Sequence, residues 1–354
     1  MSYVERRFGE AAHIVGQTNS PRSPRGVGSE LDEDARDTAD NLMLLCDHEH
    51  DEIDKPGARD AFSVEQLLEM KQEHEDRVRL ATEVGRDRAT TPIRMVGRLR
   101  GRAMELDREG VARAVIAGAG RFARFAPATR NTLEIDLRNI LGEEVPTEDY
   151  YRASRAMIDK QLAGLMASVA EGETTHISVF AWARIPLLVY LGSCLDDNVP
   201  VDVYQRHRST DSWSWPQRAT LEKFRVNVPV QGAAALEAVL LLNVSGTINP
   251  DEVPHELLSL PRFEITVDGA TPGPDTISSV ETLQRFQEAC RQLLARLEHE
   301  GHKRVRWFHV LAAVPIAAAV EFGRVFVHEA HPGLKLYDRM DDGTYRLAFE
   351  IGHL

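Results

Sequence analysis

Two histidines near the amino terminus have the chemistry that hydrolysis of a phosphodiester bond requires. His13 lies in AAHIV, and His50 lies in ADNLMLLCDHEHDEID, residues 39–54. A neutral histidine with an unperturbed pKa of about 6.5 can accept a proton from water at physiological pH. A divalent cation held by a histidine or a carboxylate can stabilise the charge that develops on the phosphate. By this chemistry His13 fits the role of a general base and His50 that of a metal ligand, roles that a family resemblance given below also implies.

A carboxylate follows His50 at helical spacing. Asp54 lies four residues later, on the same face if a helix starts near His50, and is a candidate second metal ligand. His48 is expected to be exposed at the helix start. A lone histidine is more often structural than catalytic, so each assignment has a structural alternative.

The elements that must position these side chains fall within residues 1–90, the expected first domain. NSPRSPRG, residues 19–26, is a loop whose Arg22 and Arg25 could contact a phosphate backbone or simply be solvated. The acidic run at residues 30–37 is expected to be a solvated insertion. A helix over residues 63–82 begins with a capping box, Ser63 with Gln66, and its expected apolar face consists of Val64, Leu67, Leu68 and Val78.

A basic segment follows a polar connector that ends at Pro92, the expected domain boundary. Residues 92–130 hold nine arginines and three carboxylates, a local charge of +6. This segment could bind phosphates of a nucleic acid or a cyclic nucleotide, or it could form a solvated basic surface.

The second half contains an internal repeat. Residues 177–192 align with 308–323 at an offset of 131 with five identities, among them Val189/Val320 and Gly192/Gly323. Shifted by two, residues 201–206 align with 334–339. Each copy is an apolar strand, an apolar helix ending at glycine and a second strand, which predicts two Rossmann-like lobes with parallel sheets. Residues 281–301 should form a covering helix with Cys290 in the core; neither GxGxxG nor a Walker sequence is present.

Composition limits the alternatives. The 354 residues carry a net charge of −13, which argues against a free-standing, high-affinity nucleic-acid binder. The three cysteines form neither a CxxC nor a CxxH pattern, so the sequence predicts no disulfide framework and no structural zinc. The longest apolar run, residues 310–320, is about half a membrane span, and the amino terminus lacks a secretory signal, so we expect a cytoplasmic protein without membrane association.

These motifs resemble a known domain combination. GEAAHIVG, SPRG, DNLMLLCDHEHDEID and FSVEQLLEMKQEHE resemble the HNH domain of bacterial anti-phage effectors in which it precedes a SAVED domain. SVFAWARIPLLVYLG, VYQRHR, WSW and the segment at residues 313–324 resemble the SAVED domain. The resemblance implies a multidomain fold of α+β and α/β type. A small ββα-metal HNH domain would cover residues 1–90. A SAVED domain of two fused CARF-like Rossmann lobes would cover residues 91–354, with lobe one at about 91–230 and lobe two at about 231–354.

The HNH resemblance also implies residue roles. His13 would be the base, Asn41 would tie the loop that holds it, and His50 with Asp54 would bind a divalent metal, Mg²⁺ above all. The nine-residue step from Asn41 to His50 is the spacing found in that family. Ala12 occupies the position of a further metal ligand. Glu49 stands where Cys46 would have its partner in the family's zinc knuckle, so we expect this knuckle to be lost or the start of the sequence to be truncated.

The SAVED resemblance implies a cyclic di- or trinucleotide second messenger of the CBASS pathway, homo-oligomerisation on binding, and cleavage of double-stranded DNA. Aromatic rings stack on bases and arginines neutralise phosphates. The candidate ligand residues are Tyr204, Arg206, Arg208, Trp213 and Trp215 in lobe one, and Arg324, Tyr337 and Arg339 in lobe two. Lobe packing is the alternative role of the tryptophans. Two other functions stay open: a sensor with an inactive HNH domain, and an RNA-directed or constitutive HNH nuclease in which the lobes only scaffold.

Overall fold

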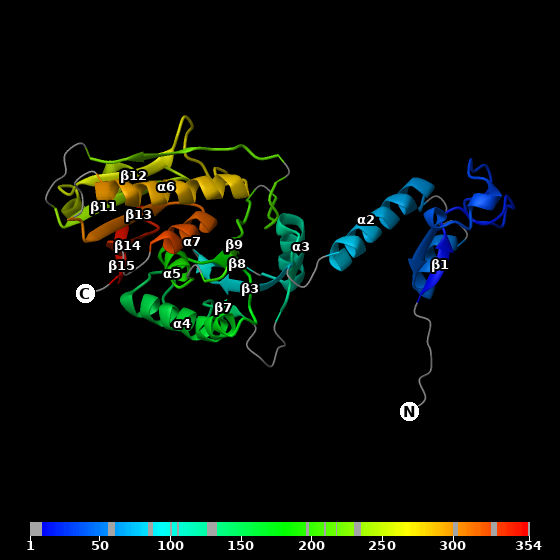
Figure 1. Ribbon diagram of the computed structural model, residues 1–354, viewed down its shortest axis with the longest axis horizontal. Helices are drawn as coiled ribbons and strands as arrows, with labels where there is room; N and C mark the ends of the chain where they lie inside the picture. Colours follow the sequence, from blue (N-terminus) through cyan, green and yellow to red (C-terminus); the bar gives the residue numbers. More distant parts are fainter. Residues whose placement is uncertain are drawn as a thin grey trace, which may run out of the picture. The chain divides into compact units, whose positions relative to one another are not determined.

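The chain forms two compact units in the computed structural model (Figure 1), which divide between Glu83 and Val84. The structure describes residues 9–55, 61–83, 88–99, 101–104, 106–125, 133–195, 198–208, 210–216, 218–229, 235–299, 304–326 and 331–352. The division lies before the expected boundary at residues 90/91, because the first strand of the second unit begins at Ala89. No helix of the described residues is long and apolar enough to cross a membrane.

The first unit is a β-hairpin with two helices. Strand β1 (Glu10–His13) pairs antiparallel with β2 (Leu42–Leu45), and helix α1 (Asp47–Asp54) follows directly. Short 3₁₀ turns, η1 (Glu33–Ala35) and η2 (Ala39–Asn41), precede β2. The strand–strand–helix order predicted for this region is therefore present.

Helix α2 (Val64–Glu83) packs on this hairpin through only part of its expected apolar face. Its amino terminus has the predicted capping box, in which Gln66 N–H donates to Ser63 Oγ and Ser63 N–H donates to Gln66 Oε1. Leu67 is fully buried with Ala12, Ile14 and Ile53. Leu68 and Val78 are exposed, contrary to the prediction.

The long loop between β1 and β2 is organised around a buried arginine. Arg36 is 1% exposed and donates to the carbonyl oxygens of Leu31, Gly16 and Gly26 and to Asn19 Oδ1 at 2.7–3.4 Å. Arg36 belongs to the acidic run at residues 30–37, so part of this run is held against the rest of the first unit. The expectation of a solvated insertion holds only for its other side chains.

Lobe one of the second unit has a parallel sheet in the order β6-β3-β8-β9, with β7 also paired to β3. Its strands are β3 (Ala89–Val96), β6 (Phe122–Ala123), β7 (Glu134–Asp136), β8 (Ile177–Trp182) and β9 (Val201–Val203). Its helices are α3 (Arg108–Ala119), α4 (Glu148–Ala170) and α5 (Ile185–Ser193), and a hairpin of β4 (Arg98–Leu99) and β5 (Arg102–Ala103) follows β3.

Pro92 lies inside β3 and does not mark a boundary. Thr91 N–H donates to His176 O on the β8 side, so the nitrogen of the next residue faces the opposite side of the strand. On that side β6 pairs only with Ala89 and Thr90, and β7 pairs only with residues 94–96. The missing N–H of proline therefore falls between two partners, where it removes no ladder hydrogen bond.

The basic segment does not form one surface among the described residues. Arg94 is 8% exposed and donates to Leu106 O at 2.6 Å and to Glu134 Oε2 at 2.5 Å. Arg121 lies 3.8 Å from Asp202. Arg100 and Arg130 lie outside the described residues. At least part of this positive charge is thus paired within the lobe.

Lobe two has a six-stranded sheet in the order β10-β12-β11-β13-β14-β15. The strands are β10 (Phe224–Asn227), β11 (Glu237–Asn243), β12 (Arg262–Val267), β13 (Trp307–Ala313), β14 (Gly333–Arg339) and β15 (Tyr345–Ile351). The four central strands are parallel as predicted, and β10 and β15 add antiparallel edges. Turns η4 (Pro250–Glu252) and η5 (His255–Leu257) precede β12. Helix α6 (Val280–His299) buries its predicted stripe, including Cys290.

The repeat predicted from the sequence relates the two lobes. Strand β8 with α5 corresponds to β13 with α7 (Ile316–Val325), and α5 and α7 lie side by side at the centre of the unit (Figure 1). A Cβ on Gly192 would lie 2.0 Å from Val320 O, and one on Gly323 would lie 2.0 Å from Val189 O. The helices therefore cross in reciprocal backbone contact, which explains why glycine and valine recur at these aligned positions.

Candidate functional site

The candidate base in the first unit has an acidic partner. His13 Nε2 lies 2.8 Å from Asp37 Oδ1, and Gln17 Nε2 donates to the same oxygen at 2.9 Å. These hydrogen bonds, from Gln17 first and then from His13, hold the pKa of the Asp37 carboxyl below its usual value. A carboxylate at Nε2 favours the tautomer with the proton on that nitrogen. The Nδ1 atom of His13 is then the one that can accept a proton.

Asn41, in turn η2 directly before β2, is hydrogen-bonded to the segment after His13. Its Nδ2 donates to Val15 O at 2.8 Å and to Arg36 O at 2.7 Å, and its Oδ1 accepts from Val15 N–H at 2.9 Å. The side chain is 4% exposed. Asn41 therefore joins the segment after β1 to the loop that carries Asp37.

If His13 acts as the base of a nuclease, Asp37→Asn should slow DNA cleavage roughly tenfold to hundredfold, as loss of a residue that orients a catalytic group typically does. The amide keeps the shape of the side chain but no longer stabilises a positive imidazolium. Initial rates of plasmid cleavage across a pH series measure the effect. The control is Asp40→Asn, whose side chain lies on the same loop and is exposed. Equal rates for the two variants would contradict a role for Asp37.

His50 and Asp54 lie together on α1, as their spacing predicted. His50 Nε2 is 3.4 Å from Asp54 Oδ2, and His50 Nδ1 is 2.9 Å from Glu10 Oε2. Ligands about 2.1 Å from an octahedral Mg²⁺ and adjacent to each other are roughly 3 Å apart, so Nε2 and Oδ2 fit two positions around one cation. Glu10 contacts the opposite ring nitrogen. Among the described residues, no three His, Cys, Asp or Glu side chains converge, so waters would complete the coordination.

The last two residues of β1, Ala12 and His13, differ in burial. Ala12 is fully buried against Ile53 of α1, whereas His13 keeps a quarter of its side chain exposed. Successive side chains of a strand point to opposite faces, so the side chains of Ala12 and His13 leave β1 on opposite sides. The structure places His50 next to Asp54, and both are candidate residues. It also places His13 next to Asp37, a residue to which the sequence analysis assigned no function.

The aromatic candidates in the lobes are mostly core residues. Tyr204 is 2% exposed and stacks on Phe180 with ring centroids 4.4 Å apart, and Trp213 packs edge-on against the same phenylalanine at 5.4 Å. Tyr337 is buried beside His309, with its hydroxyl 2.9 Å from Nδ1. A base cannot stack on a ring face that another ring already covers. In this structure these three side chains pack the lobes, which was the alternative role considered for the tryptophans.

Three of the four arginine candidates are paired with carboxylates, and the fourth is exposed. Arg206 pairs with Asp211 and lies over Trp213, and Arg339 pairs with Glu252. Arg324 lies 3.0 Å from Glu321 on α7. Arg208 is exposed in the turn that follows His207. A phosphate would have to compete with these carboxylates for the first three.

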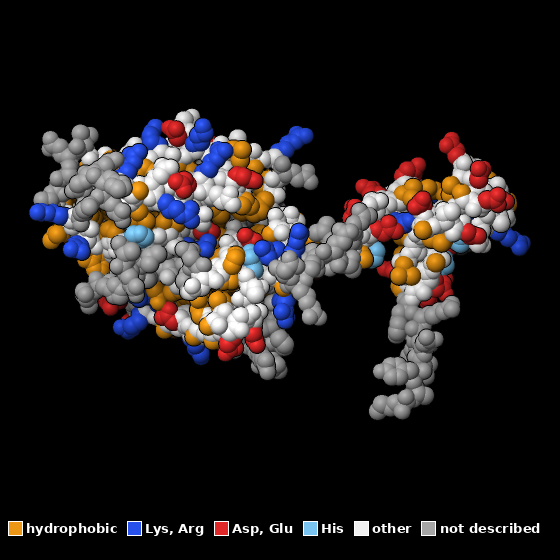
Figure 2. Space-filling model, viewed as in Figure 1, with side chains coloured by type: hydrophobic (Ala, Val, Ile, Leu, Met, Phe, Trp, Pro, Cys, Tyr) orange, Lys and Arg blue, Asp and Glu red, His pale blue; other side chains and the backbone are white. Residues whose placement is uncertain are grey.

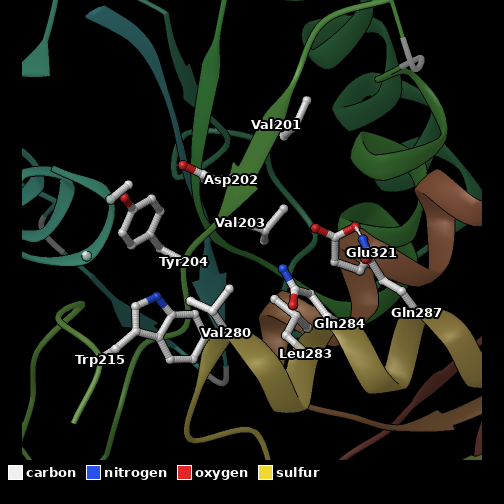
Figure 3. Close-up of a pocket in the computed structure, with 12 residues that line it drawn as sticks. Val201, Asp202, Val203, Tyr204, Trp215, Val280, Leu283, Gln284, Gln287 and Glu321 are labelled. Atoms are coloured by element: carbon white, nitrogen blue, oxygen red, sulfur yellow. Dashed lines mark hydrogen bonds between the residues drawn. The ribbon is translucent and has the colours of Figure 1, made fainter. Parts of the chain in front are cut away.

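A cavity of about 150 Å³ lies between the edge of lobe one and two helices of lobe two (Figure 3). Trp215 and Tyr204 line it on one side, and Gln287 and Glu321 line it on the other. Glu321 is hydrogen-bonded to Gln287 and Arg324, and burial raises the pKa of its carboxyl. The cavity is smaller than the roughly 300 Å³ of a typical small-molecule site, so it could hold one base of an oligonucleotide but not the whole molecule.

The outer side of β9 faces this cavity. Tyr204 N–H donates to Val179 O of β8, so the alternate residues Val201 and Val203 direct their backbone N–H and C=O groups away from β8. In lobe two, β14 is the counterpart of β9, and β15 pairs with the side of β14 that corresponds to the outer side of β9. Lobe one thus has an edge strand beside a cavity that has a half-buried tryptophan at its wall.

Each lobe contacts the amino-terminal end of a helix in the other lobe, namely α5 or α7. Asp338 Oδ2 accepts from Arg184 Nη1 at 2.9 Å, and Gln205 Oε1 accepts from Ala317 N–H at 3.1 Å. Asp338 and Gln205 occupy equivalent positions of the repeat, one residue after the aligned tyrosines. Each therefore reaches the helix start of the opposite lobe. Sequence reasoning missed Arg184, although the repeat alignment already contained its partner.

Two buried histidines of lobe one should make stability depend on pH. His176 and His207 are each 4% exposed, and burial lowers the pKa of both imidazoles below the usual 6.5. The unfolded chain therefore binds these protons more readily, so stability is full above pH 6.5 and falls as the pH drops below it. We expect the melting temperature of the second unit to fall from about pH 7.5 to about 5.5, and to fall less in His207→Asn. A pH-independent melting temperature in the native chain would contradict this.

The fold and these contacts define the second unit as a pair of fused Rossmann-like lobes with a shared helical interface. Residues 158–351 match the family model SAVED, described as "SMODS-associated and fused to various effectors sensor domain". The match covers more than half of the chain. The chain therefore belongs to the SAVED family of sensor domains. The first unit lies outside the matched residues.

Some solved structures align with part of this chain at low identity. The Acinetobacter baumannii Cap4 SAVED/CARF-domain containing receptor with the cyclic trinucleotide 3'3'3'-cAAA is 17% identical, with a TM-score of 0.46 over 65% of this chain and 51% of that chain. The Moraxella osloensis Cap4 receptor is 15% identical, with a TM-score of 0.43 over 65% and 49%. The aligned part is thus about half of each of these proteins. No curated protein matches the sequence significantly.

Proposed function

We propose that this chain is a metal-dependent DNA endonuclease that a cyclic oligonucleotide activates in anti-phage defence. His13 is hydrogen-bonded to Asp37, and Asn41 ties the segment after His13 within a strand–strand–helix unit. This arrangement supports the nuclease activity. Membership of a sensor family whose domains are fused to effectors supports the control by a ligand. The sensor occupies most of the chain, and the first unit is the effector.

His13 and Asp37 account for the proton transfer in this proposal. A water aligned with the scissile phosphorus loses its proton to His13 Nδ1, while Nε2–H stays hydrogen-bonded to Asp37. The carboxylate stabilises the imidazolium that forms. A divalent cation bound at His50 and Asp54 supplies charge stabilisation for the phosphate and the leaving oxygen.

The ligand is proposed to bind across the lobes where α5 and α7 begin. Helix starts present backbone N–H groups and partial positive charge to phosphates, and ligands of α/β sheets bind at the carboxyl ends of strands. Arg208 is exposed after β9 and is available to a further phosphate. The cavity beside β9 adjoins this edge through Tyr204 and Gln205, so one base could enter it against Trp215.

Charge gives a physical reason for control by assembly. Residues 1–83 contain 20 acidic and 10 basic residues, a net charge of −10. Acidic side chains gather on the face of the first unit seen in Figure 2. Binding to DNA depends mainly on cations that displace counterions from phosphates, so one copy of this unit should bind DNA poorly. Ligand-driven homo-oligomerisation would place several first units on one duplex and raise their effective concentration.

The test combines ligand binding with cleavage in the full-length protein. Thermal unfolding is measured with cyclic di- and trinucleotides, including 3'3'3'-cAAA and 2'3'3'-cAAA, and with linear triadenylate as control. A ligand at 100 times its Kd should raise the melting temperature by roughly 5–10 °C. The same ligand with Mg²⁺ should trigger degradation of supercoiled plasmid. Degradation without ligand, or none with any cyclic oligonucleotide, would refute the proposal.

A sensor with an inactive nuclease domain is the second candidate. Ala12 at the position of a family metal ligand and the absence of a third converging ligand among the described residues favour it. It predicts the same thermal shift with the cyclic ligand and no cleavage with Mg²⁺ or Mn²⁺.

A further inference from the structure

Arg25 joins the strand that carries His13 to the helix that carries His50 and Asp54. Its Nε donates to Ile14 O at 2.6 Å, its Nη1 donates to Ile53 O at 2.7 Å, and its Nη2 donates to Asp54 Oδ1 at 2.9 Å. The side chain is 4% exposed. It therefore cannot reach a DNA backbone, as the loop's composition suggested it could. Arg22 in the same loop is exposed.

The backbone of Arg25 is held in a conformation that favours glycine. Its φ angle is +55°, a region that a residue with a side chain rarely adopts unless the surroundings impose it. A Cβ at the next residue, Gly26, would lie 2.2 Å from Thr18 O, so the turn is tightly packed. The hydrogen bonds of the guanidinium group offset the conformational cost of this backbone angle.

The two oxygens of Asp54 have different partners. Oδ1 accepts from Arg25, while Oδ2 faces His50 Nε2 at 3.4 Å. A planar guanidinium donates in fixed directions, so it sets the plane of a carboxylate that it binds. The orientation of Asp54 toward His50 therefore depends on an arginine of the loop between β1 and β2.

We propose that Arg25 is a positioning residue of the nuclease site. It fixes Asp54 so that one oxygen faces His50, and it ties that pair to the carbonyl groups at the end of the His13 strand. The proposal rests on the proposed nuclease function for its catalytic consequence, but the orientation of His50 can be observed without cleavage. Arg25→Met is the test variant, and Arg22→Met removes the same charge from the exposed side of the same loop.

The first measurement is cleavage at saturating ligand and Mg²⁺. Arg25→Met should lower kcat roughly tenfold or more, as losses of orienting residues do, while Arg22→Met stays near the native rate. Asp54→Asn should also lower kcat, and adding Arg25→Met to it should cause little further loss, because both act through one carboxylate. Independent effects that multiply in the double variant would overturn the proposal.

The second measurement is the NMR spectrum of the histidine rings in the full-length protein. Arg25→Met should shift the ring resonances of His50, and those of His48, which is 78% exposed on the same helix, should stay in place. Arg25→Lys should shift His50 as well, because one ammonium group cannot bind Asp54 and the carbonyl oxygens of Ile14 and Ile53 together. Unmoved His50 resonances in these variants would overturn the positioning role. A native protein that never cuts DNA would instead refute the nuclease proposal, and this spectrum would still decide the role of Arg25.

Discussion

In the proposed nuclease, His13→Ala is expected to abolish ligand-activated DNA cleavage and to leave ligand binding unchanged. A general base typically contributes roughly 10²–10⁴-fold to a rate, and no other imidazole is hydrogen-bonded to Asp37 among the described residues. The side chain is a quarter exposed and outside the small buried cluster of the first unit, so its loss should cost little stability. The second unit has its own core, which the substitution does not touch.

The measurement is the initial rate of plasmid cleavage beside the ligand-induced shift in melting temperature. His48→Ala is the matched control, because His48 is exposed on α1 and pairs only loosely with Glu52, at 3.8 Å. We expect this control to cut DNA at the native rate. Cleavage that persists in His13→Ala would place the base elsewhere and would refute the mechanism derived from the hairpin.

Gly192→Ala is expected to be strongly destabilising, although it adds only one methyl group. That carbon would lie 2.0 Å from Val320 O and 2.9 Å from Val320 C, both backbone atoms of α7 that no rotamer change can move. Overpacking of this kind typically costs roughly 1–3 kcal/mol, and the cost is larger where helices must separate. A loss of 1 kcal/mol lowers the melting temperature by roughly 2–4 °C in a domain of this size.

The control is Gly164→Ala on α4, where a Cβ would meet nothing within 4 Å. Alanine is favoured over glycine inside a helix by about 1 kcal/mol, so this variant should melt higher than the native chain. We also expect Gly192→Ala to weaken binding of the cyclic ligand, since separation of α5 from α7 moves the two helix starts apart. A melting temperature for Gly192→Ala equal to that of Gly164→Ala would show that the crossing is not tightly packed.

The sequence by itself determined the features that local patterns encode. The offset of 131 residues identified both lobes, because each copy needs the same strand, helix and glycine to form one crossing. The capping box of α2 and the stripe of α6 followed from periodicity and spacing. The order of two strands and a helix around Asn41 and His50 was implied by the resemblance to HNH domains, and the structure has this order. These properties depend on neighbours within a few residues or on exact repetition.

Only the tertiary structure decided which side chains are paired and which are buried. Asp37 came from a run of acidic residues that looked solvated, and Arg25 came from a loop that looked available to phosphates. Tyr204 and Trp213 had the residue types of a base-stacking site, but both pack against Phe180 in the core. Pro92 looked like a boundary and lies within a strand, between two partial partners. In each case the partner is distant in sequence, and the type of a residue does not reveal which surface will cover it.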